Sequence, residues 1–198
     1  MRRGFLAARE DLVKKLSELV ASRHQKLFGV VNEILEQALR VYGFGKSLSE
    51  VVDEYEALMV GRKAGYVLVA QGLLYPLVEG AYLRQGNKLE KAWYEHGVWL
   101  GSYLSARFGA EDLEKLEKVM NVLLWEASEF KLTKNGDKVT LRCIGSAIPP
   151  SYTSLLASFL EGVMNAYGLT AVRKDVSRGV VILDLARQEG EALEGEQA

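Results

Sequence analysis

Cysteine and histidine are scarce in this 198-residue chain, which has one cysteine and two histidines. A single cysteine excludes an intrachain disulfide framework and is typical of a reducing compartment, so we expect a cytoplasmic protein. His24 and His96 are far apart in the sequence, and no His, Cys and Asp residues stand at the spacing of a metal-ligand cluster. The sequence therefore predicts no metal site and no cofactor.

Long apolar runs are also missing, although 48% of the residues are hydrophobic. No stretch approaches the roughly 20 apolar residues that a transmembrane helix needs, so we expect no membrane partner. The opening residues have Arg2 and Arg3 but only a short apolar stretch before Glu10, which does not resemble a signal peptide. The hydrophobic content is nevertheless enough for a sizeable core, in one domain or two small ones.

No catalytic constellation is recognisable. Residues 43–46 (Gly-Phe-Gly-Lys) form no phosphate-binding loop, because the stretch is short and lacks a strand–turn–helix frame. Glu111 and Asp112 suit the N-terminus of a helix, where they cap it and complement its dipole. Cys143 alternates with apolar residues, which indicates a packed thiol, with a redox sensor as the alternative. We therefore predict that the protein is not an enzyme.

What the sequence does contain begins with two amphipathic helical segments. The first spans Glu10 to Ser22 and the second Leu27 to Tyr42, where Gly43 and Gly45 end it. A unit of roughly 45 residues cannot bury two wide apolar stripes by itself, so we expect a homodimer. The stripes recur at spacings of three and four: Leu12, Val13, Leu16, Leu19 and Val20, then Leu27, Val30, Val31, Ile34, Leu35, Ala38, Leu39 and Tyr42.

Residues Arg3 to Tyr42 resemble a ribbon-helix-helix DNA-binding module of the MetJ and Arc type. Residues 8–12 (Ala-Arg-Glu-Asp-Leu) sit where that family enters its first helix, and residues 27–35 are similar to its second helix. The family often has a glycine and then a capping Ser or Thr before the second helix, where this chain has His24 and Lys26. The resemblance implies a dimer whose antiparallel ribbon enters the major groove.

The resemblance also implies which residues meet DNA. By register, Arg3 would read a base edge and Phe5 would touch a thymine methyl group. The remaining contacts would be to phosphates. The DNA-binding residues expected on this basis are Arg2, Arg3, Phe5, Gln25 and Lys26.

Charge is distributed unevenly in a way that agrees with a DNA-binding N-terminus. Residues 1–46 hold nine Lys/Arg and five Asp/Glu, a net charge of +4, whereas the remainder holds 16 and 21, a net charge of −5. The basic excess therefore lies at the proposed DNA end. A plain helical hairpin packed on the rest of the chain is the structural alternative.

Residues 47–65 predict a connector helix, because Ser47 and Glu50 have the spacing of a capping box. Residues 66–186 then predict an α+β domain with the order ααα-ββ-α-ββ and an antiparallel four-stranded sheet. Its helices are expected near residues 72–83, 88–108, 111–124 and 150–168, and its strands near residues 129–143, 170–176 and 179–185, with a hairpin turn at Asn135-Gly136. Residues 187–198 predict a disordered acidic tail.

Gly97 and Gly101 stand one helical turn apart, which predicts close approach of another helix. Together with the Asn135-Gly136 hairpin and residues 158–163 (Ser-Phe-Leu-Glu-Gly-Val), they resemble the superfamily of 4-vinyl-reductase-like ligand-binding domains and TRAPP vesicle-tethering subunits. The resemblance implies a sensor or dimerisation domain with a pocket for an apolar small-molecule effector. This chain lacks the Cys-rich closing motif common in the vinyl-reductase group.

The candidate pocket residues are Trp93, His96 and Trp99. Their alternative interpretation is packing, because tryptophans, Trp125 included, are more often core residues and His96 could be a partly buried histidine.

The sequence as a whole predicts a homodimeric DNA-binding transcriptional regulator. The alternatives are a non-enzymatic scaffold of the TRAPP-like type that dimerises without DNA, and a small-molecule binder without a DNA role. The chain has a low content of Cys, Asn and Gln and a high content of Glu, Lys and Leu. This composition is typical of a protein from a thermophile, of an archaeal-like kind.

Overall fold

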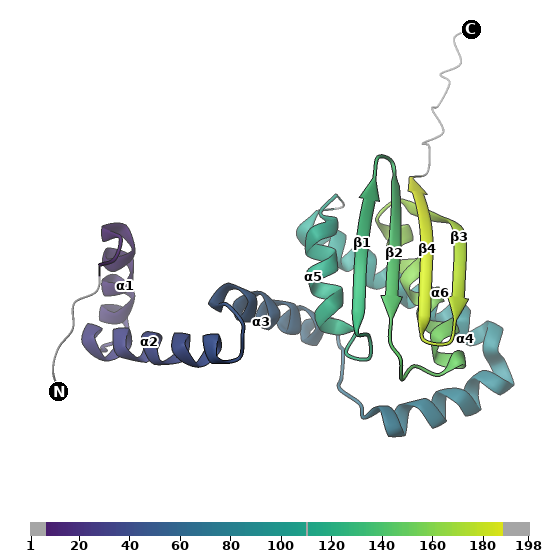
Figure 1. The fold of residues 1–198 in the computed structure, drawn as a ribbon, viewed down its shortest axis with the longest axis horizontal. Coiled ribbons are helices and arrows are strands. Elements are labelled where there is room, and N and C mark those ends of the chain that lie inside the picture. The colour runs from purple at the N-terminus through teal and green to yellow at the C-terminus, as the bar shows by residue number, and fades with distance from the viewer. Residues whose placement is uncertain (1–6, 110, 188–198) are drawn as a thin grey trace, which may run out of the picture. The chain divides into compact units, whose positions relative to one another are not determined.

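The computed structural model describes residues 7–109 and 111–187, and the chain divides into two compact units (Figure 1). Met1–Asp53 form the first unit and Glu54–Ala198 form the second. The boundary falls inside helix α3 (Leu48–Lys63), so that one continuous helix begins in the first unit and ends in the second.

The first unit contains helices α1 (Glu10–Ser22) and α2 (Leu27–Gly43), followed by the start of α3. Both helices occupy the ranges predicted from the apolar spacing, except that Gly43 is the last residue of α2 rather than its terminator. The terminating position belongs to Gly45, whose φ of 75° lies in the left-handed region.

The turn between α1 and α2 uses an unusual residue. His24 has a φ of 54° and is the only non-glycine residue with positive φ in the described part of the chain. Its backbone N–H donates to the carbonyl of Ala21, and that of Gln25 donates to the carbonyl of Val20, both at 3.1 Å. This pair of bonds is a Schellman motif, in which glycine is the usual residue at the left-handed position.

The capping box predicted at the start of α3 is confirmed. The backbone N–H of Ser47 donates to the Glu50 carboxylate at 2.6 Å, and the backbone N–H of Glu50 donates to the Ser47 hydroxyl at 3.2 Å. These bonds, the backbone bond first, lower the pKa of the Glu50 carboxyl. Later in α3, Ala57 and Val60 are buried, and Gly61 faces the side chain of Leu123.

The second unit is built on a four-stranded antiparallel sheet, as predicted. Its strands are β1 (Glu129–Asn135), β2 (Lys138–Ile144), β3 (Leu169–Ser177) and β4 (Val180–Arg187), in the spatial order β1-β2-β4-β3. The predicted β1–β2 hairpin is confirmed, although its two-residue loop is Gly136-Asp137 rather than Asn135-Gly136, because Asn135 pairs with Lys138. Gly136 has a φ of 62°, as the first loop position of a type II′ turn requires.

Strand β4 ends at Arg187, two residues beyond the predicted end at Leu185. The sequence placed Arg187 in a disordered tail, but Arg187 pairs with Leu169 at the end of the β3–β4 ladder. Its guanidinium also contacts the Glu111 carboxylate at 2.9 Å. These two interactions hold the residue in the sheet, and residues 188–198 lie outside the described part of the chain.

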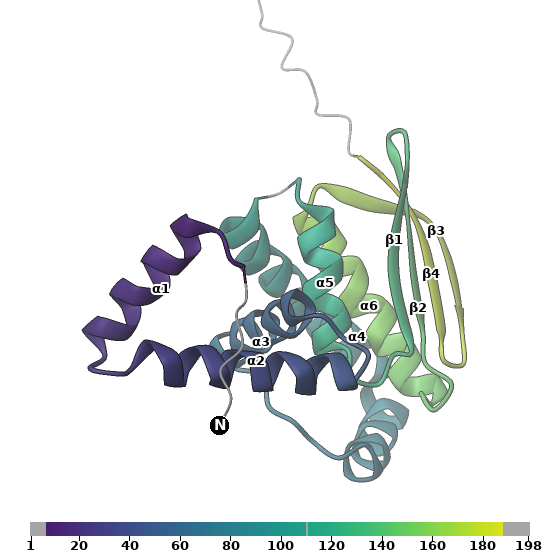
Figure 2. The same ribbon diagram turned by 60° about the vertical axis from the view of Figure 1, so that its left-hand side comes forward.

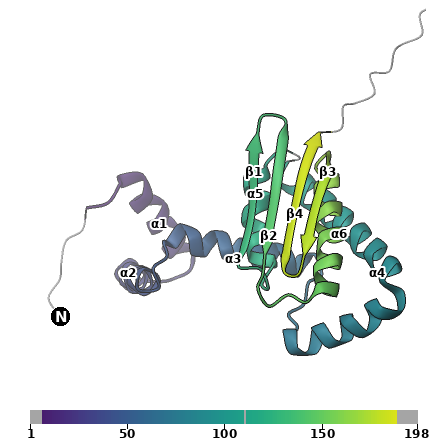
Figure 3. The same ribbon diagram turned by 45° about the vertical axis from the view of Figure 1, so that its right-hand side comes forward.

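The helices of this unit lie on one side of the sheet (Figure 2). Helices α5 (Leu113–Leu123) and α6 (Pro150–Ala166) pack against the strands, and α4 (Gln71–Phe108) packs on α6. The predicted helices 72–83 and 88–108 are the two halves of α4, which meet at a kink where Gln85 has a φ of −147° (Figure 3). The open face of the sheet carries polar pairs such as Thr140 with Asp184. None of the helices in the described residues has the combination of length and apolarity needed to span a bilayer.

The core of the second unit lies between the sheet and the three helices. Alternate residues of the central strands point into it, which is the period-two pattern read from the sequence. The largest fully buried side chains are Leu100, Leu104, Leu116, Met120, Leu141, Ile148, Leu155, Leu156, Leu160, Met164, Leu183 and Leu185.

Close contact between α4 and α6 is the tightest constraint in this core. A Cβ added to Gly97 would overlap the carbonyl oxygen of Phe159, and one added to Gly101 would lie 2.6 Å from the carbonyl oxygen of Val163. From the other side, a Cβ on Gly162 would overlap the carbonyl oxygen of Tyr94. The prediction that Gly97 and Gly101 admit another helix is confirmed, because the two backbones touch at these glycines.

We predict that Gly97→Ala lowers the free energy of unfolding by about 2 kcal/mol or more, because the methyl group would force backbone atoms of α6 aside. Urea denaturation of the full chain measures this value. Gly80→Ala in the same helix is the matched control, since only the flexible end of Arg84 lies near its Cβ. The control should be neutral or stabilising by up to about 1 kcal/mol. Equal stability of the two variants would contradict the helix contact.

Candidate functional site

Three of the five residues expected to bind DNA, Arg2, Arg3 and Phe5, lie outside the described residues. The other two, Gln25 and Lys26, are exposed and stand at the start of α2. Lys26 is the N-cap residue but makes no side-chain cap hydrogen bond, which confirms that this helix lacks a conventional cap. No acidic residue occupies the first turn of α2, so its positive end is left open to an anion.

The apolar stripes of the first unit are largely left uncovered by that unit's own residues. Helix α2 has no buried residue, and α1 has only Val20. Leu39 is 73% exposed and Ile34 43% exposed, although both belong to the predicted apolar stripe. Exposed apolar area of this extent on so small a unit is typical of an interface.

The candidate pocket residues of α4 come together in an aromatic row. The ring of His96 stacks on Trp99 at 5.5 Å and on Phe159 at 5.9 Å, measured between ring centroids. Trp93 instead turns inward and meets Tyr152 edge-on at 5.1 Å. The expectation that all tryptophans pack in the core is wrong for Trp99, which is 46% exposed.

His96 and Trp125 also depart from the packing interpretation. His96 is exposed rather than partly buried, although its ring lies against those of Tyr66, Trp99 and Phe159. Trp125 is 61% exposed because it follows the end of α5 and points away from the core cluster. Neither periodicity nor composition distinguishes an inward from an outward tryptophan at a helix end.

A carboxylate stands next to this aromatic row. Tyr152 donates its hydroxyl to the Glu126 carboxylate at 3.0 Å. Burial first, and then the charge of Glu126, raises the pKa of the Tyr66, Tyr75 and Tyr152 hydroxyls, so all three remain protonated. The hydroxyls of Tyr66 and Tyr75 are buried without a hydrogen-bond partner among the described residues. Because these three tyrosine hydroxyls stay protonated, they are suited to a structural role rather than to general acid–base catalysis.

Cys143 is a packed thiol, as predicted. It is buried, and burial followed by the charges of Glu126 and Glu129 raises its pKa to about 12. A thiol with such a pKa is almost entirely protonated at neutral pH and is a poor nucleophile. The described residues also contain no group of three or more His, Cys, Asp and Glu side chains arranged to hold a metal ion.

A cavity of about 740 Å³ lies between the N-terminus of α5 and one end of the sheet. Its apolar lining consists of Leu113, Leu132, Val139, Tyr167 and Leu169. Its charged lining consists of the carboxylates Glu111, Asp112, Glu114, Glu117 and Asp137 and the cations Lys131, Lys134 and Arg187. The candidate residues Trp93, His96 and Trp99 do not line this cavity.

Tyr167 is the buried polar group of this cavity. The residue is 7% exposed, and its hydroxyl has no hydrogen-bond partner among the described residues. Burial, with a smaller contribution from Asp112, raises the pKa of Tyr167 to about 12, so the hydroxyl is neutral at pH 7. Sequence reasoning missed this residue, because Tyr167 follows α6 and meets the other cavity residues only through the fold.

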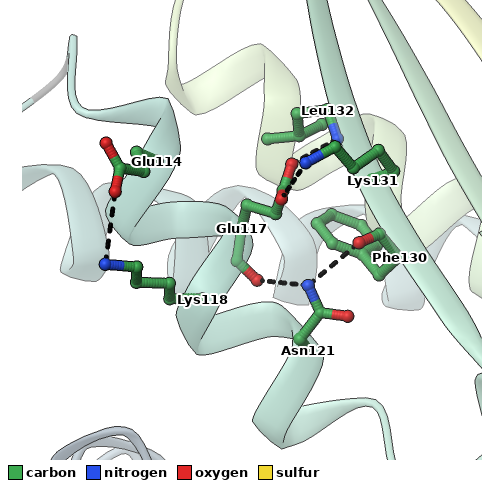
Figure 4. Close-up of polar contacts among 7 residues, drawn as sticks. All are labelled: Glu114, Glu117, Lys118, Asn121, Phe130, Lys131 and Leu132. Atoms are coloured by element: carbon green, nitrogen blue, oxygen red, sulfur yellow. Dashed lines mark hydrogen bonds and ion pairs between the residues drawn. The ribbon is translucent and has the colours of Figure 1, made fainter. Parts of the chain in front are cut away.

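Helix α5 is fastened to strand β1 by a polar clamp beside the cavity (Figure 4). The Glu117 carboxylate accepts hydrogen bonds from the Lys131 ammonium and from the backbone N–H of Leu132, both at 2.7 Å. One turn later, the Asn121 amide donates to the carbonyl of Phe130 at 2.9 Å. Its hydrogen bond with Glu117 raises the pKa of Lys131, so the ammonium group stays protonated at neutral pH.

We predict that Glu117→Ala lowers the free energy of unfolding by about 1–3 kcal/mol, because the Leu132 N–H at the half-buried helix–strand seam loses its acceptor. Glu114→Ala is the matched control on the same helix. Its side chain is 82% exposed and pairs only with Lys118, so its loss should cost less than about 0.5 kcal/mol. Urea titration of both variants gives the comparison. A Glu117 variant as stable as the control would show that the clamp adds nothing.

A scan of protein-family models and a search of curated proteins each found no match for this chain. Function is therefore argued from the residues alone. Two features are available for that argument: the exposed apolar and basic surface of the first unit, and the cavity of the second.

Proposed function

We propose that the chain is a homodimeric DNA-binding transcriptional regulator whose second unit senses a ligand or adds a dimer contact. The observation that carries the proposal is the uncovered apolar stripe on α1 and α2. A unit of this size with so little buried apolar surface is not expected to be stable as a monomer. A second copy that presents the same stripes is the simplest way to cover them.

The DNA contact is supported by the start of α2. Its first turn follows Lys26 and has neither a side-chain cap nor an acidic residue, and this combination favours a phosphate. The net charge of +4 on residues 1–46 would be doubled in a dimer. The assignment of Arg3 to a base edge and of Arg2 to a phosphate remains an implication of the ribbon-helix-helix resemblance.

The alternative function is a protein-interaction scaffold that dimerises without DNA. It is favoured by the first half of α4 and the segment before it, where Leu68, Leu73, Leu77 and Leu83 are each more than two-thirds exposed. No charged residue occurs from Ala64 to Val78, so this surface is suited to a protein partner. DNA binding by the full chain separates the two functions.

The dimer prediction is tested by Ile34→Asp, which places a charge in the apolar stripe of α2. Analytical ultracentrifugation should show a dimer for the wild type and an association at least about tenfold weaker for the variant, because an unpaired charge is costly to bury. Glu36→Lys is the control, since this equally drastic change of charge falls on the polar side of the same helix. A monomeric wild type, or a dimer untouched by Ile34→Asp, would contradict the proposal.

The DNA prediction is tested by fluorescence titration of the full chain with its own upstream DNA and with an unrelated duplex. Lys26→Ala should weaken binding to both duplexes equally and reduce the salt slope by about 2 for a dimer, since each chain loses one phosphate contact. Arg3→Ala should reduce the preference for the upstream duplex by about tenfold, as loss of a base contact does.

Lys88→Ala is the control for both substitutions, because Lys88 is an exposed lysine of α4 outside the proposed module. It should leave affinity and salt slope unchanged. Absence of binding to either duplex at low salt would remove DNA from the function. The scaffold and the small-molecule binder without a DNA role would then be the functions that remain.

A further inference from the structure

The cavity beside α5 has the size and the mixed lining of a ligand site. Its volume of about 740 Å³ falls in the range of about 300–1,000 Å³ typical of small-molecule pockets. It is formed by the start of α5, the β1–β2 hairpin, the residue after α6 and the two strand ends that meet at Leu169 and Arg187. Because these segments are distant in sequence, the cavity exists only in the folded second unit.

The apolar part of the lining can receive a hydrocarbon group. Val139 and Leu169 are buried residues of β2 and β3, and Leu113 and Leu132 are half-buried. These side chains come from both layers of the unit, so a group that enters between them is enclosed by helix on one side and sheet on the other. An aromatic or branched aliphatic body fits a lining of this kind.

The charged part of the lining favours a cation. Five carboxylates and three cations line the cavity, a net charge of −2. Two of the cations already serve carboxylates of the same lining, Lys131 with Glu117 and Arg187 with Glu111. Asp112 and Glu114 pair with Lys115 and Lys118, which do not line the cavity and are more than half exposed, so solvent screens those pairs. The turn residue Asp137 has no ion pair among the described residues.

Tyr167 places a buried hydroxyl without a hydrogen-bond partner among the described residues in the wall of the cavity. Its hydroxyl can accept a hydrogen bond from an ammonium group and donate one in return, yet it does neither within the described chain. A buried hydroxyl without a partner carries a desolvation cost, which a ligand group with N–H donors would relieve. The acidic residues at the start of α5 have a structural role of their own, so Tyr167 is the independent sign of a ligand.

We propose that this cavity binds a small organic cation, an ammonium group on an apolar body, with the ammonium between Tyr167 and the carboxylates and the body against Leu113, Leu132 and Val139. The proposal names the chemical class of the ligand that the second unit would sense, and in that respect it rests on the proposed function. It does not require that the first unit bind DNA.

The test is a series of probes matched in shape and different in charge, each titrated into the full chain and followed by isothermal calorimetry. The three probes are 2-phenylethylammonium, 2-phenylethanol and 3-phenylpropanoate, which share an aromatic body and differ in charge. The ammonium should bind with a dissociation constant of about 1 mM or tighter, as expected for a fragment of this size. The alcohol should bind at least about tenfold more weakly, and the carboxylate should not bind. Binding of the ammonium should also weaken as salt is raised.

Tyr167→Phe should weaken binding of the ammonium roughly fivefold, since it removes one hydrogen bond and keeps the ring. Tyr66→Phe is the matched control, because its hydroxyl is also buried without a partner but does not line the cavity. Asp137→Asn, at an exposed turn where folding is not at risk, should weaken binding severalfold. Thermal melting confirms that each variant is folded.

Three outcomes would overturn the proposal: no binding of any probe up to about 10 mM, equal binding of the three probes, or a folded Tyr167→Phe variant that binds as the wild type does. These outcomes are distinguishable from failure of the proposed function. Calorimetry without DNA reports on the cavity alone, and the DNA titration without ligand reports on the first unit alone.

Discussion

The contact between α4 and α6 is the constraint on which the second unit depends. At Gly97, Gly101 and Gly162 the two helices approach until backbone meets backbone, with no side chain between them. Leu160 and Met164 of α6 belong to the same buried cluster as Leu100 and Leu104 of α4 and as Leu141 and Leu183 of the central strands. A wider separation of α4 from α6 would open voids between the two helices, which close-packed interiors do not tolerate.

The cavity is a consequence of where this packing stops. Helix α6 and the second half of α4 fill the middle of the inner face, whereas α5 is held to β1 through Glu117 and Asn121. Near the start of α5 the helix layer and the end of the sheet are bridged by the Arg187–Glu111 pair rather than by apolar side chains. Across this face of the sheet, close packing of helices gives way to polar contacts between helix and strand. The cavity therefore has an apolar floor and a charged rim.

Local signals in the sequence predicted the elements well. Period-two alternation predicted four strands, the Ser47–Glu50 spacing predicted a capping box, and the two glycines of α4 predicted a close helix neighbour, all confirmed. The errors lie where tertiary contacts determine the structure of a segment. Arg187 joins the sheet because Leu169 and Glu111 reach it, although its neighbours in sequence resemble a tail.

The candidate site was harder to predict than the fold for the same reason. The aromatic residues of α4 were predicted to line a pocket because they are close together in the sequence. In the structure they stack on the helix surface or pack into the core. Tyr167 carried no signal, because a tyrosine after a helix is ordinary until its hydroxyl is found without a partner. Sites assembled from distant segments become visible only when the fold places those segments together.

The two units satisfy different physical requirements, and α3 belongs to both. The second unit has a complete core within one chain, whereas the first exposes the apolar stripes that its own helices cannot cover. Helix α3 begins at the Ser47–Glu50 capping box of the first unit and ends against Leu123 at the C-terminal end of α5. The N-terminal end of the same α5 lines the cavity. Helix α5 is therefore the element of the second unit that both forms a wall of the cavity and packs against the end of α3.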